Sequence, residues 1–487
     1  MVRRFAAVMV LAASACTPFK QRFTCASDAQ CVNGGASGVC ELNAVCSFPD
    51  GSCPGSGRRY GAFAPPELAN ACVPPGGPMP DGGSMDGGGD AAPSCGLAGD
   101  PCCASGAACA SPQLKCTSGV CTACVLAVAG GAAHTCALGA AGGVVCWGKN
   151  GNGQLGSGST SDALTPTVVV DGAGAPLANI TALTAGAAHT CALRSDGSVF
   201  CWGDDSDGQL GVGGSAAQNP QAAPAALTSV GALAAGAHHT CAALITSGLA
   251  YCWGRNDAGQ LGAPPPTGNP SPAAVVMANG TQLDHVIALA AGATHTCARR
   301  SDGTLWCWGS NASGELGNGT MAPSASPVAV VTLGTAVAQV AAGAGFTCAA
   351  LANGGVSCWG ADGFGQSGQP AAAQVAVPTV VPSLGGVTAL ALGDAHACAR
   401  RAGGGVSCWG HDLRGQLGAG DFQDRSAPFA VAAVPPLDAA FAGAGAAHTC
   451  AIQAGGLACW GADDSGQLGD GQHTDEKSPV AALLTCP

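Results

Sequence analysis

The tripeptide Cys-Trp-Gly occurs seven times in the second part of the chain, and no other feature restricts the possible folds as strongly. Successive copies lie 50 to 55 residues apart. A motif that returns at a nearly constant spacing of this length indicates a repeat architecture in which each copy is one supersecondary unit. The cysteines of the seven copies are Cys146, Cys201, Cys252, Cys307, Cys358, Cys408 and Cys459.

Each copy belongs to a longer pattern. An Ala-Gly-x-x-His-Thr-Cys-Ala segment precedes it, a Gly-Gln-Leu-Gly turn follows it, and a Pro-x-x-Val run such as 166–170 closes the unit. Short β-rich runs separated by Gly, Asn and Asp, with no helical period, predict four-stranded β-sheets. The preceding segments add a second cysteine to each unit: Cys136, Cys191, Cys241, Cys297, Cys348, Cys398 and Cys450.

This order of motifs resembles the regulator of chromosome condensation repeat over 125–486. The resemblance implies an all-β fold, a seven-bladed β-propeller whose blades surround a central channel. It does not extend to that family's nucleotide-exchange activity, because the blades here are uniform in length and carry no long wedge-like insertion. A secreted inhibitor of β-lactamase is built on a similar propeller, so the fold alone names no function.

The two cysteines of a unit predict a hairpin cross-link. Cys191 and Cys201 are ten positions apart, which leaves a three-residue loop, Ser195-Asp196-Gly197, whose third position favours glycine. Opposed positions on antiparallel strands have Cα separations of about 4.5 to 5.5 Å, which suits a disulfide. The alternative is that the cysteines are buried reduced thiols. We predict seven bridges within the blades: Cys136–Cys146, Cys191–Cys201, Cys241–Cys252, Cys297–Cys307, Cys348–Cys358, Cys398–Cys408 and Cys450–Cys459.

The N-terminus predicts export. Arg3 and Arg4 precede an apolar run over 5–11, and small residues lead to Cys16, an arrangement that resembles a bacterial lipobox. We therefore expect a signal peptide over 1–15 and a lipid on Cys16, with ordinary cleavage after Ala15 as the alternative. The 29 cysteines also favour an oxidising compartment.

Composition divides the remainder of the chain. A cysteine-rich segment over 16–72, including the lipobox cysteine, precedes a Pro/Gly/Asp-rich linker over 73–94, and a second cysteine-rich segment over 95–124 precedes the propeller over 125–487. The disulfide connectivity of the two cysteine-rich segments is open. A ring must close between its ends, so we predict a clasp between Cys124 and Cys486, with Cys121 as an alternative to Cys124.

Three sets of repeated residues are candidate sites. The histidines are spread around the propeller axis, which favours a structural hydrogen-bonding role over metal binding. The tryptophans of the seven tripeptides favour packing between blades over a ligand cage. Turn residues such as Asn150, Asp205, Asp207, Asn256, Asp463 and Asp464 suit β-turns better than calcium. We expect no metal and no cofactor. The histidines are His134, His189, His239, His295, His396 and His448, and Phe346 replaces the histidine in the fifth unit.

Charge and motifs restrict the function. The net charge is −12 with a pI near 5.1, which disfavours nucleic acid and electrostatic docking to an anionic membrane. No recognised catalytic motif is present. We expect a non-catalytic binding module held in the bacterial cell envelope, at the outer membrane or cell surface, by its lipid anchor, with a protein or a glycan as partner. The alternatives are a polysaccharide-acting enzyme that uses the channel and a secreted inhibitor of another protein. The sequence indicates nothing about oligomerisation.

Overall fold

The computed structural model describes residues 125–484 apart from 215, 266–267, 332, 432–443 and 454–455, together with the backbone of seven short strands before residue 124. The chain divides into two units, 1–91 and 92–487, and each is considered by itself. The expected signal peptide, Cys16, the linker over 73–94 and both cysteines of the expected clasp, Cys124 and Cys486, lie outside the described residues.

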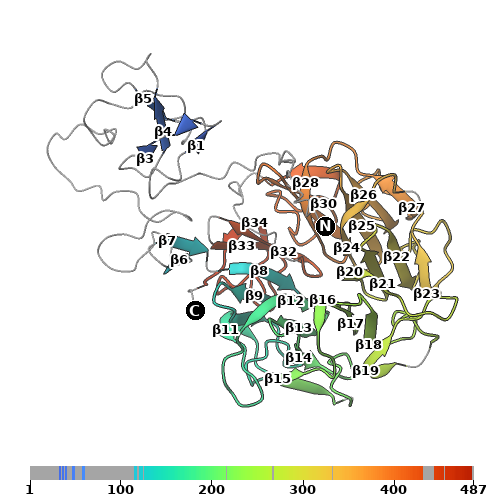
Figure 1. Cartoon of the computed structure of the whole chain (residues 1–487). Helices are drawn as coiled ribbons and strands as arrows, with labels where there is room; N and C mark the ends of the chain where they lie inside the picture. Colours follow the sequence, from blue (N-terminus) through green and yellow to red (C-terminus); the bar gives the residue numbers. More distant parts are fainter. Residues whose placement is uncertain are drawn as a thin grey trace, which may run out of the picture. The chain divides into compact units, whose positions relative to one another are not determined.

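The second unit contains a ring of seven blades (Figure 1). In the first blade β8 (Val125–Gly130), β9 (His134–Gly139), β10 (Val144–Gly148) and β11 (Ala163–Val168) pair antiparallel in chain order. The fold class predicted from the repeat is therefore confirmed.

The other blades repeat this order. Their inner strands are β12 (Ile180–Ala185), β16 (Val230–Ala235), β20 (Val286–Ala291), β24 (Val337–Ala342) and β28 (Val387–Leu392). The second strands are β13 (His189–Arg194), β17 (His239–Leu244), β21 (His295–Arg300), β25 (Phe346–Leu351), β29 (His396–Arg401) and β32 (His448–Gln453). The third strands are β14 (Val199–Asp204), β18 (Ala250–Gly254), β22 (Leu305–Gly309), β26 (Val356–Ala361), β30 (Val406–Gly410) and β33 (Gly456–Gly461). The outer strands are β15 (Gln218–Pro224), β19 (Asn269–Ala274), β23 (Ser324–Ala329), β27 (Gln374–Val380), β31 (Arg425–Ala430) and β34 (Glu476–Ala481).

The described part of the seventh blade has three named strands and the end of an inner one. Ala444 forms an antiparallel bridge with Thr449, the same register as Gly130 with Thr135 in the first blade. All seven blades thus follow one plan.

The hairpin between the second and third strands has the predicted geometry. Gly197 has a φ of 81°, and its N–H donates to the Arg194 carbonyl at 2.9 Å, which closes a tight turn. Cys191 lies directly opposite Cys201, and their sulfurs are 2.11 Å apart. All seven pairs are at disulfide distance, with Cα separations of 4.0 to 4.1 Å that fall slightly below the expected range.

Apolar packing occurs between blades. Trp202 of the second blade lies in one buried cluster with Cys136, Leu138 and Leu155 of the first blade, and all seven tripeptide tryptophans are fully buried. Each of the seven blade interfaces has its own cluster of this kind. The predicted role of the tryptophans in packing between blades is confirmed.

The glycine that ends each Gly-Gln-Leu-Gly turn permits this contact. Gly156 has a φ of 64°, and a Cβ built there would lie 2.8 Å from the Trp202 ring. Any side chain would therefore collide with the neighbouring blade and strain the backbone.

The last blade meets the first through the same kind of contact. Trp147 of the first blade packs with Cys450, Leu457 and Leu468 of the seventh. The described residues thus close the ring by apolar contacts and hydrogen bonds.

The short strands near the N-terminus form small sheets. They are β1 (Val32–Asn33), β2 (Ala36–Ser37), β3 (Val39–Cys40), β4 (Cys46–Pro49), β5 (Arg58–Tyr60), β6 (Leu114–Thr117) and β7 (Val120–Ala123). Their backbone register places Cys40 opposite Cys46 and Cys116 opposite Cys121. Within the described residues, no helix is long and apolar enough to cross a membrane.

Candidate interaction face

Two sets of loops form one end of the propeller, which we call the channel face. One set joins the first and second strands of each blade, as at 131–133, and the other follows the third strand, as at 149–156. The N–H of Lys149 donates to the Ala133 carbonyl at 2.8 Å, and the equivalent bond ties the two sets together in every blade.

A shared polar joint connects neighbouring blades beneath this face. The main-chain carbonyl of Gln154 accepts the indole N–H of Trp202 at 2.9 Å and the hydroxyl of Thr190 at 3.3 Å. His134 Nε2 lies 2.8 Å from the same hydroxyl. The threonine oxygen donates to the carbonyl, so it accepts from the imidazole, which assigns the proton to Nε2.

The joint recurs around the ring. Histidine and threonine of successive blades pair as His134–Thr190, His189–Thr240, His239–Thr296, His295–Thr347, His396–Thr449 and His448–Thr135. The last pair joins the seventh blade to the first. The structural role predicted for the histidines is therefore confirmed.

The remaining joint, between the fifth and sixth blades, differs from the others in both of its partners. Phe346 occupies the histidine position in the fifth blade, and the residue that would receive its hydrogen bond is Ala397. Both side chains are fully buried and belong to one apolar cluster. An apolar pair leaves no buried hydroxyl or imidazole without a partner, which explains why the two changes occur together.

The joint histidines are neutral at physiological pH. Burial lowers the pKa of His134 and of His189 to about 3, and that of His448 to about 4. Among the described residues the Nδ1 atom of each joint histidine has no hydrogen-bond partner. It faces the glycine three residues earlier; a Cβ on Gly131 would lie 2.4 Å from His134 Nδ1. The histidines are therefore sealed inside the joints.

Of the six candidate calcium ligands, Asn150, Asp205, Asn256 and Asp463 cap turns instead, whereas the carboxylates of Asp207 and Asp464 contact His238 and Arg414. Asn150 Oδ1 accepts the N–H of Leu155 at 2.9 Å, and Asp463 Oδ1 accepts that of Leu468 at 2.8 Å. Asn150 Nδ2 also donates to the carbonyls of Ser159 and Ser161, at 3.0 and 2.9 Å. No group of three or more His, Cys, Asp or Glu that could hold a metal ion occurs in the part of the chain that the structure describes.

The channel is narrow and built from small residues. It has a volume of about 170 Å³, and the turns that line it consist of Gly and Ala apart from Leu392 and Asp394. Main-chain hydrogen bonds encircle it, including Ala132 N–H to Ala187 O at 3.1 Å and Ala446 N–H to Gly131 O at 3.2 Å. Because Asp394 is the one titratable side chain among the described residues of this lining, these residues offer little polar chemistry.

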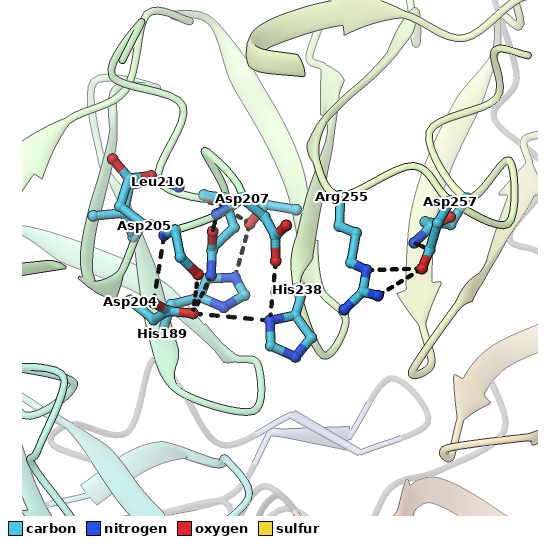
Figure 2. Close-up of polar contacts among 12 residues, drawn as sticks. His189, Asp204, Asp205, Asp207, Leu210, His238, Arg255 and Asp257 are labelled. Carbon is cyan, nitrogen blue, oxygen red and sulfur yellow. Dashed lines mark hydrogen bonds and ion pairs between the residues drawn. The ribbon is translucent and has the colours of Figure 1, made fainter. Parts of the chain in front are cut away.

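Charged side chains gather on the channel face where the second and third blades meet (Figure 2). His238 Nδ1 lies 3.5 Å from Asp207 Oδ2 and 3.8 Å from Asp204 Oδ2, so the contact crosses the blade interface. The Asp204 carboxylate is held by Gln209 Nε2 at 2.6 Å and by Ser206 Oγ at 3.1 Å.

An ion pair on the third blade extends this group. Arg255 Nη2 lies 2.7 Å from Asp257 Oδ2, and the Arg255 N–H donates to the His238 carbonyl at 2.9 Å. Other blades have Ala133, Ala188, Thr294, Gly345, Ala395 or Ala447 in place of His238. Sequence reasoning missed this group, since its residues stand at variable positions and only the fold brings them together.

Comparison with known proteins agrees with the fold. The model of the RCC1-like domain matches residues 220–485, and models of the regulator of chromosome condensation (RCC1) repeat match 125–154, 180–209, 141–193 and 196–243. The ultraviolet-B receptor UVR8 of Arabidopsis thaliana is 31% identical over 345 residues, which cover 69% of this chain and 77% of UVR8. The human E3 ubiquitin-protein ligase HERC2 is 31% identical over 241 residues, which cover 49% of this chain but only 5% of HERC2.

Solved structures share the architecture. Prp20p from Saccharomyces cerevisiae superposes with a TM-score of 0.61 at 21% identity, over 72% of this chain and 87% of that chain. Human WBSCR16 superposes with a TM-score of 0.56 at 23% identity, over 66% of this chain and 84% of that chain. At these identities the likeness is one of fold alone.

Proposed function

The chain belongs to the RCC1-like family of β-propellers, and from this premise we propose that it is an exported, envelope-anchored module whose channel face binds a protein and which has no catalytic activity of its own. One observation carries the proposal. The repeated His, Thr, Trp and Asx side chains are used in the joints and turns that hold the blades together. The channel-face residues that differ between blades are not used in this way, so they are the residues that would recognise a partner.

The charged group around His238 supports a protein partner. It combines Arg255 with the carboxylates of Asp204, at the end of β14, and of Asp207 and Asp257, on loops of two blades. Arginine is among the residue types enriched at protein interfaces. Prp20p, which has the same fold, binds Gsp1p and histones, which are proteins. A glycan is the other candidate partner and would be recognised in the same experiment.

The cysteines support the proposed export and anchoring. The fourteen blade cysteines lie in pairs at disulfide distance, an arrangement that favours an oxidising compartment. A lipid on Cys16 would hold the protein at the envelope. Intact-mass measurement of the native protein should show the lipid, and the Cys16→Ser variant should lack it. A mature chain that begins at Cys16 without lipid would favour the secreted inhibitor.

The channel gives little support to an enzyme. Glycoside hydrolysis uses a pair of carboxyl groups, whereas Asp394 is the one carboxylate among the described residues that line the channel. We expect no turnover in a screen of cell-wall and extracellular glycans. Activity that is lost in Asp394→Asn would overturn the non-catalytic assignment.

Cross-linking of the full-length protein to its neighbours in the native envelope tests the binding function. We expect cross-links to a protein at channel-face loops, and Asp257→Lys should lower recovery of that partner by about tenfold, because it reverses a charge in the group and breaks the pair with Arg255. The matched control is Asp302→Lys, on a turn at the opposite end of the propeller. The two side chains are 46% and 53% exposed, and each lies beside an arginine. Equal losses in the two variants, or recovery of glycan alone, would contradict the proposal.

A further inference from the structure

Two adjacent blades depart from the others at the turn that precedes Gly-Gln on the channel face. Between the capping Asn or Asp and the glycine, five blades carry only small or polar residues: Gly151 and Asn152, Ser206 and Asp207, Asp257 and Ala258, Ala312 and Ser313, and Asp464 and Ser465. The fifth blade has Phe364 at these positions, and the sixth has Leu413 and Arg414. The five other blades show that the turn itself requires no large side chain.

These large apolar side chains are exposed. Phe364 is 40% exposed and Leu413 is 66% exposed, although both belong to turns whose flanking residues are buried. The Phe364 ring packs on the His411 ring, with centroids 4.1 Å apart, so the contact crosses from the fifth blade to the sixth. Exposed aromatic and aliphatic side chains on a rigid frame are typical of binding surfaces.

The sixth blade also carries a charged residue at the channel mouth, Asp394. The His411 N–H donates to the carbonyl of Ala395, the residue after Asp394, at 3.0 Å. Asp394 lines the channel, where the six equivalent positions are all alanine: Ala132, Ala187, Ala237, Ala293, Ala344 and Ala446. We call Asp394, His411, Leu413 and Phe364 the blade-six track.

The charge of Asp394 has no counter-charge within the described residues. Among those residues no hydrogen bond or ion pair reaches its carboxylate, Asp394 is exposed at the channel, and partial burial raises its pKa. The arginine beside Leu413, Arg414, is already bound by Asp464 at 2.6 Å and by Asp475. A cation brought by a partner would complement the free carboxylate.

The channel limits what that cation can be. Its volume of about 170 Å³ is below the roughly 300 to 1,000 Å³ of small-molecule sites. It has room for the end of one side chain, while the apolar part of the track lies outside on the loops.

We propose that the blade-six track binds a segment of a partner protein that places a lysine or arginine at the channel mouth against Asp394 and an apolar side chain against Phe364 and Leu413. The inference rests on the proposed binding function and specifies which side chains of the partner contact the track. Basic and apolar contacts together would provide both orientation and affinity, since neither a free cation nor a simple apolar surface could occupy both ends of the track.

Binding of two pools of short, degenerate, fluorescent peptides to the full-length protein tests the proposal. One pool has a fixed central lysine, and the other has norleucine, which keeps the hydrocarbon chain and lacks the charge. We expect the lysine pool to bind about tenfold more tightly and Asp394→Asn to abolish the difference between the pools. Leu413→Ser should weaken both pools, because it removes the apolar contact.

Ile245→Ser is the matched control for Leu413→Ser. Ile245 is also 66% exposed, but it lies in the hairpin loop after β17, at the opposite end of the propeller, so its replacement should leave binding unchanged. The proposal would be overturned if the lysine preference survived Asp394→Asn, or if the Leu413→Ser variant bound both pools as tightly as the parent protein. It would also be overturned if neither pool bound the parent protein. A dimer, detected by light scattering, that Leu413→Ser dissociates would overturn it too, because the occupant would then be a second copy of the chain.

The cross-linking experiment separates this inference from the proposed function. If Asp394→Asn and Leu413→Ser retain the cross-linked partner while Asp257→Lys loses it, the channel face binds protein but the blade-six track does not. If all three variants retain it, the channel face itself is not the binding surface.

Discussion

At the scale of single residues, the joints between blades show how a buried polar group is tolerated. Each joint histidine donates to a threonine, the threonine donates to a carbonyl, and that carbonyl also accepts a tryptophan N–H. Burying any one of these groups without its partner would cost about 1 to 3 kcal/mol. The Phe346 and Ala397 joint avoids that cost by removing the imidazole and the hydroxyl together.

Converting that joint to the common type should reveal the coupling. Phe346→His alone buries an imidazole beside Ala397, and Ala397→Thr alone buries a hydroxyl beside Phe346, so each should lower the free energy of unfolding. The double variant should recover about 1 to 2 kcal/mol of the summed loss, because the new pair satisfies itself. Urea unfolding with disulfides intact measures the cycle, and strict additivity would contradict this account.

The capping positions give a second prediction. Asn150 Nδ2 donates to two carbonyls, whereas Asp463 Oδ2 is buried without a partner among the described residues. Burial raises the pKa of Asp463 to about 7. In the unfolded chain an aspartate has a pKa near 3.8, so the folded state binds this proton more tightly. The free energy of unfolding therefore falls as the pH rises from about 4 to 7.

Asp463→Asn should therefore raise the free energy of unfolding by about 2 kcal/mol at pH 8 and change it little at pH 4. Asp470→Asn is the comparison variant: it removes the same charge from the same blade outside the buried cap, and because Asp470 raises the pKa of Asp463 less than burial does, its effect should have the same sign and be smaller. Chemical unfolding at the two pH values provides the measurement. An effect of Asp463→Asn that is equal at both pH values would rule out the titration as its cause.

At the scale of elements, the hairpin between the second and third strands was predictable because its spacing, turn residues and cross-link all impose one register. A three-residue loop with a glycine at positive φ sets the cysteines opposite each other, and a shift by one residue would turn them to opposite faces of the sheet. The longer loop between Cys241 and Cys252 keeps the same opposition, since Gly248 also has a positive φ.

Removing one cross-link should destabilise a blade measurably. Cys191→Ala with Cys201→Ala should lower the free energy of unfolding by about 2 to 3 kcal/mol, the entropy that a bridge closing a loop of about eleven residues removes from the unfolded chain. Alanine is used because both sulfurs are fully buried and a serine hydroxyl would lack a partner. Thiol titration of the denatured native protein is the companion measurement, and reactive thiols at these two positions would show that the bridge does not form.

At the scale of the whole molecule, six buried histidines make the stability of the ring depend on pH. Six joint histidines have a pKa of about 3 to 4 in the folded state, against about 6.5 when unfolded. The unfolded chain therefore binds more protons below pH 6.5, and each histidine lowers the free energy of unfolding by about 1.4 kcal/mol per pH unit as the pH falls toward its folded value. Asp412 and Asp463, with a pKa of about 7, act in the opposite direction.

We expect steep acid destabilisation between pH 6.5 and 4. Near pH 5, unfolding should take up at most about four protons, because six bind at the histidines and two are released by Asp412 and Asp463. Asp205, Asp362 and Asp394, whose pKa burial also raises, should reduce this number further. The slope of the free energy of unfolding against pH measures this number. His295→Phe with Thr347→Ala, a copy of the natural Phe346 and Ala397 joint, should lower it by about one, and a slope near zero in the parent protein would refute the assignment of neutral buried histidines.

The recurring tripeptides, hairpin spacing and turn residues determined the blade count, the four-stranded sheets, the opposed cysteines and the packing role of the tryptophans. These features depend on local chemistry that is repeated seven times, so each copy predicts the others. Only the tertiary structure decided which side chains meet across blades. The His–Thr–carbonyl joints, the charged group at His238 and the blade-six track all join residues from different units, and closure of the ring sets their distances. The residues of the charged group and of the blade-six track also vary from blade to blade, so no repeat pattern could predict those two sites.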